Sequence, residues 1–180
     1  MNRKVINVEL PTSSVDNAIK QLTNIRKSIK MINEDFIIES LEWVMEKAKK
    51  YHELRTYNFP NTANINNDWK IKKVFGKKNE MGYKLINNNE LVAYVEFGTG
   101  IVGEMQPHKQ ANNVNYEYDM NNHKLDGWTF YNDEFNLYFI DFIGYEGQSF
   151  LYDAFWDYFY KDKWKEIYQK NYDKYMKYIK

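Results

Sequence analysis

The sequence predicts an α+β protein with a long N-terminal helical segment, a central antiparallel sheet and a long C-terminal helix. Residues 12–59 contain no Gly or Pro and space their apolar residues by three and four, which is typical of a helix. Short runs of β-type residues separated by Gly, Asn and Asp follow. Residues 149–179 again lack Gly and Pro. We expect one domain over residues 1–180, mainly helical at 1–55, mainly β at 65–147 and helical at 148–180.

The N-terminal segment begins with an expected short strand at residues 5–10, which Pro11 ends. Ser13 and Asp16, three residues apart, resemble a helix-capping pair. The helical rhythm is broken near Asn33, where one step between apolar residues is five. The pattern allows either one long helix with a phase shift or two helices in a hairpin. The apolar residues of this segment are Ala18, Leu22, Ile25, Ile29, Ile32, Ile37, Leu41, Val44, Ala48 and Tyr51.

A basic β-hairpin is predicted after a loop at residues 56–67. Its strands are residues 69–75 and 81–86, joined by a turn at residues 76–79. Lysines dominate this stretch and would form a basic outer face that contacts DNA phosphates or a partner. The same lysines also fit a solvated strand edge that blocks unwanted pairing. The residues concerned are Lys70, Lys72, Lys73, Lys77 and Lys78, with Lys84 nearby.

The middle of the chain begins with an apolar run at residues 90–97, which fits either a short buried helix or a strand. Gly98, Gly100 and Gly103 predict a tightly turning exit from it. Strands are predicted at residues 114–118, 128–131 and 137–142, separated by turns rich in Asn, Asp and Gly. The final helix carries aromatic residues on more than one face, which indicates contact with another subunit.

Composition limits the function classes. The chain has 25 basic and 25 acidic residues, so a strongly basic nucleic-acid binder is disfavoured. Residues 1–90 hold 16 basic and 11 acidic residues, whereas residues 91–180 hold 9 and 14, a polarity that suits head-to-tail assembly of identical subunits. There is no Cys, which excludes disulfides and thiol catalysis. We expect no membrane-spanning helix and no signal peptide, hence a protein made in the cytoplasm.

No catalytic motif occurs. His52, His108 and His123 stand far apart in sequence, and His108 is expected to be an exposed structural residue. The acidic residues between positions 117 and 146 lack calcium-loop spacing and are expected to be solvated. We therefore expect no enzyme activity, no cofactor and no metal.

The segment AYVEFGTG resembles a motif of the HK97 gp10-like family of phage tail-completion and head–tail joining proteins. Its residues are Ala93, Tyr94, Val95, Glu96, Phe97, Gly98, Thr99 and Gly100. Pro107-His108, Gly127-Trp128 and the later Gly147, Phe150 and Ala154 resemble other parts of that family, although Ser149 stands where Pro is usual. The resemblance covers about residues 10–160.

The resemblance implies a structural virion protein at the head–tail junction, assembled in the host cytoplasm. It implies a ring of identical subunits, a hexamer, through which DNA passes without sequence-specific binding. Its other partners would be neighbouring neck or connector proteins and tail-tube or terminator proteins, in particles of any tail type. No catalytic residue is implied. Glu96, among apolar neighbours, is expected to accept backbone N–H groups of the following turn or to pair with Lys or Arg.

Two other function classes remain. One is a phage-encoded DNA-binding protein or enzyme that uses the Lys70–Lys84 hairpin or the scattered histidines. The other is a regulatory or immunity protein that forms no ring.

Overall fold

The computed structural model describes residues 12–55, 62–76, 81–89, 91–114, 128–132 and 136–177. The fold is α+β, as predicted, with a long N-terminal helix, antiparallel strand pairs and C-terminal helices. The helices are α1 (Thr12–Arg55), α2 (Leu91–Phe97), α3 (Gly100–Met105), α4 (Ala111–Val114), α5 (Phe150–Tyr160), α6 (Lys163–Met176) and the 3₁₀ helix η1 (Thr62–Asn67). The strands are β1 (Trp69–Phe75), β2 (Met81–Asn87), β3 (Gly98–Thr99), β4 (Trp128–Asn132), β5 (Leu137–Phe142) and β6 (Gly144–Glu146).

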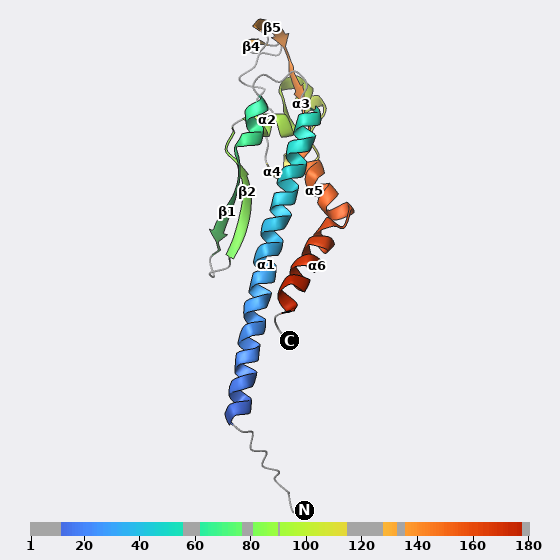
Figure 1. The fold of residues 1–180 in the computed structure, drawn as a ribbon. Helices are drawn as coiled ribbons and strands as arrows, with labels where there is room; N and C mark the ends of the chain where they lie inside the picture. The colour runs from blue at the N-terminus through green and yellow to red at the C-terminus, as the bar shows by residue number, and fades with distance from the viewer. Residues whose placement is uncertain are drawn as a thin grey trace, which may run out of the picture.

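Helix α1 is the longest element, and the β1–β2 hairpin, α5 and α6 all pack against it. Its 44 residues form one helix, which decides between the two arrangements that the sequence allowed. At 1.5 Å per residue its length is about 66 Å. Figure 1 shows strands β1 and β2 along one side of α1 and helices α5 and α6 along another, while the first part of α1 projects beyond all of them. The predicted capping residue Ser13 lies inside the helix, and the predicted strand at residues 5–10 lies outside the described residues.

The phase shift at Asn33 marks the place where α1 enters the body of the molecule. Side chains 13–24 are all exposed, whereas those from residue 34 onward are mostly buried or half-buried. The apolar pattern changes there because the helix acquires neighbours on two sides. Its partners from this point are the β1–β2 hairpin, α5 and α6.

The predicted basic hairpin is present. Strands β1 and β2 pair antiparallel, from Trp69 opposite Asn87 to Phe75 opposite Met81. Trp69 and Leu85 lie on the face that packs against the core. Because side chains alternate along a strand, Lys70 and Lys72 lie on the opposite, outer face. The predicted loop before the hairpin contains η1 at residues 62–67, and its earlier residues lie outside the described part.

The middle of the chain contains more helix than predicted. Among the described residues, the strands form three separate two-stranded antiparallel sheets, β1–β2, β3–β6 and β4–β5, rather than one continuous central sheet. Between them, residues 91–105 are mainly helical, and Val114 ends helix α4 instead of beginning a strand. The strands predicted at residues 128–131 and 137–142 are present as β4 and β5.

The predicted apolar run forms helix α2 from Leu91 onward, and the start of this helix is capped. The side-chain oxygen of Asn89 accepts the backbone N–H of Leu91 at 2.9 Å, and its carbonyl accepts that of Val92 at 3.2 Å. Such a bond satisfies a donor that the first turn of a helix leaves without a partner.

The C-terminal segment is two helices instead of the single predicted helix. Helix α5 ends at Tyr160 and α6 begins at Lys163. Asp162, between them, adopts a left-handed conformation with φ of 53°. The turn lets α6 bend back along α1, where Lys174 binds Asp35 at 2.7 Å and Lys170 binds Glu39 at 2.9 Å.

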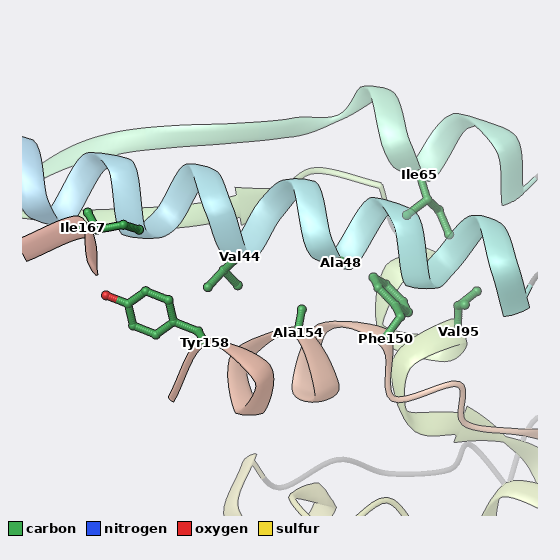
Figure 2. Close-up of a cluster of buried hydrophobic side chains, with 8 residues drawn as sticks. All are labelled: Val44, Ala48, Ile65, Val95, Phe150, Ala154, Tyr158 and Ile167. Carbon is green, nitrogen blue, oxygen red and sulfur yellow. The ribbon is translucent and has the colours of Figure 1, made fainter. Parts of the chain in front are cut away.

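The core lies where α1, α5 and the start of the hairpin meet. Figure 2 shows Val44 and Ala48 of α1 facing α5, which contributes Phe150, Ala154 and Tyr158 at four-residue intervals. Ile65 of η1, Val95 of α2 and Ile167 of α6 close the cluster. The Tyr158 hydroxyl donates a hydrogen bond to Ser40 Oγ at 2.6 Å, so the polar end of this core residue is also satisfied.

His52 of α1 is part of this core. Its side chain is 1% exposed, and its ring lies 5.3 Å from that of Phe150, edge to face. Burial lowers the pKa of His52, because the charged imidazolium is poorly solvated there.

We therefore expect His52 to make the fold sensitive to mild acid. The unfolded chain takes up a proton near pH 6.5, whereas the folded chain keeps His52 neutral to lower pH. Stability should then fall as the pH drops through 6.5, by at most about 1.4 kcal/mol per pH unit from this residue. Denaturant unfolding at pH 7.5 and 5.5 measures it. In His52→Phe the difference between the two pH values should be smaller, and an unchanged difference would assign the effect to other groups.

Candidate functional site

The segment AYVEFGTG joins three elements. It comprises the end of α2, the two residues of β3 and the first residue of α3. Strand β3 pairs antiparallel with β6, with Gly98 opposite Glu146 and Thr99 opposite Tyr145, and Gly100 forms a further bridge with Gly144. We call residues 97–100 and 143–147, which face each other along this contact, the motif seam.

The seam brings two backbones closer together than side chains allow. Gly98, Gly100 and Gly144 have φ of 92°, 63° and 117°, values that favour glycine. A Cβ on Gly144 would lie 2.0 Å from the carbonyl oxygen of Thr99, and one on Gly147 would lie 2.5 Å from the carbonyl carbon of Phe97. These glycines are therefore required by the packing of backbone on backbone. The predicted turning role holds for Gly98 and Gly100, whereas Gly103 lies inside α3.

Glu96, at the end of α2, binds the start of α5. One carboxylate oxygen accepts the backbone N–H of Leu151 at 2.8 Å, and the other accepts that of Tyr152 at 2.9 Å. The side chain is 5% exposed. The first N–H groups of a helix lack intrahelical partners and carry partial positive charge, so a carboxylate placed there is well stabilised. The prediction of backbone donors is confirmed, but the donors lie 55 and 56 residues along the chain and not in the following turn.

His108 also faces Glu96, which corrects the prediction that it is exposed. Its Nε2 lies 3.3 Å from a carboxylate oxygen of Glu96, and the residue is 8% exposed. Its Nδ1 accepts the backbone N–H of Gln110 at 3.0 Å. In a neutral imidazole this places the proton on Nε2, directed at the carboxylate. The ring also contacts Phe97 and Tyr152, with centroid distances of 4.6 and 5.1 Å. The side chain that faces Glu96 is thus a histidine, and not the Lys or Arg that the sequence offered as the alternative to backbone donors.

Backbone contacts complete the junction between α2 and α5. The carbonyl oxygens of Val95 and Glu96 accept the N–H groups of Gln148 at 2.8 Å and Ser149 at 3.1 Å. Ser149 has φ of 51° and precedes the first residue of α5. Proline could supply neither this φ nor this N–H group. The structure therefore accounts for a residue other than Pro at position 149.

Arg55, at the end of α1, also binds the residues around the start of α5. Its guanidinium donates to the carbonyl oxygen of Gln148 and lies 2.7 Å from a carboxylate oxygen of Asp153. It also lies 4.7 Å from the centroid of the Tyr51 ring. Tyr51 in turn donates to Asp157 of α5 at 2.6 Å, and this bond raises the pKa of Tyr51 to about 12. Two residues of α1 thus bind α5, at Asp153 and at Asp157.

The motif residues therefore have structural roles. Val95 is fully buried in the core, and Phe97 packs against His108. Thr99 is 7% exposed and paired within the seam, while Ala93 is half-buried on α2. Both oxygens of Glu96 are occupied by the start of α5, so the carboxylate is already engaged and is poorly placed for acid–base chemistry on a ligand.

The described lysines of the predicted basic set lie on two different faces of the hairpin. Lys70 and Lys72 are exposed on the outer face, and Lys84 joins them because it lies directly opposite Lys72. We call these three residues the basic hairpin face. Lys77 and Lys78 lie outside the described residues.

Lys73 does not belong to the basic hairpin face. It lies on the inner face and binds Glu34 of α1 at 3.0 Å. Tyr83 also donates to Glu34. The hydrogen bonds from Tyr83 and then Lys73 lower the pKa of Glu34. Strand alternation carries this signal in the sequence, because Lys73 shares its parity with Trp69 and Ile71.

Helices α5 and α6 expose an unusual amount of aromatic surface. We call this surface the aromatic face. Tyr160 is 76% exposed, and the rings of Tyr168 and Tyr172 stack at an interplanar angle of 28° with centroids 6.4 Å apart. Exposed aromatic clusters of this kind are typical of protein interfaces, and the subunit contact stays a prediction. The members are Phe155, Trp156, Phe159, Tyr160, Trp164, Tyr168 and Tyr172.

Within the described residues, no three His, Asp or Glu side chains gather closely enough to hold a metal ion. The acidic residues predicted to be solvated between positions 117 and 134 lie outside that part of the chain. No helix among the described residues has the length and apolar character needed to cross a membrane. Comparisons with protein-family models, with curated proteins and with solved structures find no match.

Proposed function

We propose that this chain is a structural subunit of a tailed phage or phage-tail-like particle, placed at the head–tail junction as a tail-completion or joining protein. The observation that carries the proposal is the AYVEFGTG segment. Its carboxylate, its glycines and its apolar residues are all engaged in joining α2, the motif seam and α5. A motif with a purely architectural role supports a structural protein more than an enzyme.

The surfaces also support this proposal. A ring subunit must bind identical neighbours and other neck proteins, and the aromatic face offers apolar surface for such contacts. The basic hairpin face offers three lysines to the phosphates of DNA that passes through the ring. We propose self-assembly into a ring, a hexamer by resemblance, with neck or connector proteins and tail-tube or terminator proteins as neighbours.

The position of the gene tests this function most directly. We expect it to lie between head-completion and tail-tube genes, and we expect the chain to be found by mass spectrometry in particles purified by density gradient. A gene that stands alone, together with particles that lack the chain, would overturn the proposal. A regulatory or immunity role would then be favoured.

The basic hairpin face makes a separate prediction about DNA. In Lys70→Glu/Lys72→Glu/Lys84→Glu, binding of a duplex fragment by the purified chain should weaken at every sequence tested. If all three lysines contact phosphates, the slope of log K against log salt should fall by roughly 2.7. The matched control is Lys20→Glu/Lys27→Glu/Lys50→Glu, which reverses three exposed charges on α1 and should keep the wild-type slope. Equal slopes in wild type and the hairpin variant would remove DNA contact from this face.

The same experiment separates the proposed function from its alternative. The exposed lysines would also suit a DNA-binding protein that acts outside the particle. Such a protein should discriminate between duplex sequences by 10³-fold or more. Binding that varies little between sequences supports a subunit through which DNA passes.

A further inference from the structure

The projecting part of α1 has an apolar side that is exposed over its first turns, and it acquires neighbours only near the body, where Ile32 is 3% exposed and Ile29 lines a hollow with Met81 and Tyr83 of β2. Val15, Leu22 and Ile29 recur every seven residues, and Ala18, Ile25 and Ile32 do the same three positions later. This is the spacing of a helix that packs against another helix. Leu22 is 65% exposed, Ile19 56% and Ile29 49%. An isolated helix in water gains little from its own hydrogen bonds, so a partner along this side would stabilise it.

Charge identifies the kind of partner. The projecting part, residues 12–33, contains one acid, Asp16, and four bases, Lys20, Arg26, Lys27 and Lys30. Two such segments packed side by side would repel each other. The next part of the same helix, residues 34–46, contains five acids and no base. The helix is thus basic where it projects and acidic where it joins the body, so the basic part of one copy complements the acidic part of another.

A groove between α1 and α6 lies beside the acidic part. Its rim holds Glu39, Glu42 and Glu46 of α1 and Glu166 of α6, against Lys163 and Lys170. Trp43 and Ile167, both partly buried or buried core residues, also line it. The two lysines bind Glu166 and Glu39, which leaves Glu42 and Glu46 as the exposed acids of the α1 side. The groove therefore offers an apolar base with an acidic rim.

The spacing of the charges matches. On a helical wheel, Arg26 and Lys30 flank the apolar side of the projecting helix, whereas Lys20 and Lys27 lie on the opposite side. Arg26 and Lys30 are four residues apart, as are Glu42 and Glu46. Each pair spans about 6 Å along its helix, at 1.5 Å per residue. One helix can therefore place its two flanking cations against the two exposed acids.

From this match we propose that the projecting part of α1, residues 15–30, docks in the α1–α6 groove of a second copy of the chain. Arg26 and Lys30 face Glu42 and Glu46 in this contact, and the apolar side covers Trp43 and Ile167. The two surfaces differ, so the contact joins subunits head to tail and can close a ring. This inference rests on the self-assembly part of the proposed function and names the surfaces that perform it.

Charge reversal with exchange of partners tests the contact. The helix variant is Arg26→Glu/Lys30→Glu, and the groove variant is Glu42→Lys/Glu46→Lys. Among the described residues, Glu46 forms an ion pair with Lys49, and the other three side chains form none. The fold should therefore persist in both variants, and circular dichroism verifies it. Sedimentation at low salt, where charge interactions are least screened, measures the mass.

We expect the wild-type chain to self-associate at low salt and each variant alone to associate at least tenfold more weakly. An equimolar mixture should regain mixed complexes, because the reversed helix of one variant complements the reversed groove of the other. The matched control Lys20→Glu/Lys27→Glu reverses two charges on the opposite side of the same helix and should associate like wild type. A helix variant that associates like wild type would overturn the docking, as would a mixture without mixed complexes or a wild-type chain still monomeric at about 1 mM.

The outcomes distinguish the inference from the proposed function. Particles that contain the chain, combined with self-association that ignores both variants, would reject this docking and keep the virion role. Charge-dependent association in solution, combined with particles that lack the chain, would keep the docking and reject the virion role.

Discussion

Gly144→Ala should destabilise the fold by roughly 4 kcal/mol. The new Cβ would lie 2.0 Å from the carbonyl oxygen of Thr99 and 2.9 Å from the Cα of Gly100. Both neighbours are backbone atoms, so no side-chain rotation can relieve the overlap. The φ of 117° adds strain of its own for any residue with a Cβ. Strain and overpacking each cost about 1–3 kcal/mol, and here they occur together.

Chemical denaturation with far-UV circular dichroism measures this loss. Gly82→Ala is the matched control, because a Cβ there would lie 3.5 Å from Val74 Cγ2, an ordinary contact. Gly82 lies inside β2, where Ala is favoured over Gly by about 0.5–1 kcal/mol. The control should therefore be neutral or slightly stabilised. Equal stability of the two alanine variants would refute the close backbone contact in the motif seam.

Glu96→Ala should destabilise the fold by about 3 kcal/mol. It removes the acceptor for the N–H groups of Leu151 and Tyr152 and leaves His108 beside a cavity. Hydrogen bonds to a charged acceptor contribute about 1.5–3 kcal/mol each, part of which water entering the cavity restores. A loss of this size lowers the Tm of a chain of this length by roughly 6–12 °C.

Thermal unfolding of three variants tests the role of this carboxylate. Glu96→Gln keeps one acceptor oxygen but turns an amide donor toward a second donor, so its Tm should fall between those of wild type and Glu96→Ala. Glu104→Ala, which removes an exposed glutamate from α3, should change stability by no more than about 0.5 kcal/mol. An unchanged Tm in Glu96→Ala would show that α5 does not depend on this cap.

Local patterns in the sequence were sufficient to predict the helix and hairpin. Steps of three and four predicted α1, and alternation around a lysine-rich turn predicted β1 and β2. Two further features are visible in the order of residues. Asn89 could have indicated a cap for α2, and the parity of Lys73 could have placed it on the inner face. Both are consequences of residue order within one element.

Contacts between distant segments could not be predicted in the same way. An isolated glutamate among apolar residues indicates that partners are needed, but it does not say that they lie at the start of a helix 55 residues later. The burial of His108 follows from that same junction. The break between α5 and α6 lacks Gly and Pro, since Asp162 itself adopts the left-handed conformation. Such features depend on tertiary packing, which outweighs local preference.

The motif seam affects which parts of the sequence can accept substitutions, insertions and deletions during evolution. The bridge between Gly100 and Gly144 fixes both ends of the 43-residue segment between them, which we call the excursion. The entropy of closing a loop grows only with the logarithm of its length, and each doubling costs about 0.6 kcal/mol. Lengthening or shortening the β4–β5 hairpin within that excursion should thus change the stability of the Gly100–Gly144 bridge very little. The β4–β5 hairpin is the natural site for sequence drift and for grafted peptides, whereas the glycines at the base of the excursion and the buried His108 within it have little freedom to vary.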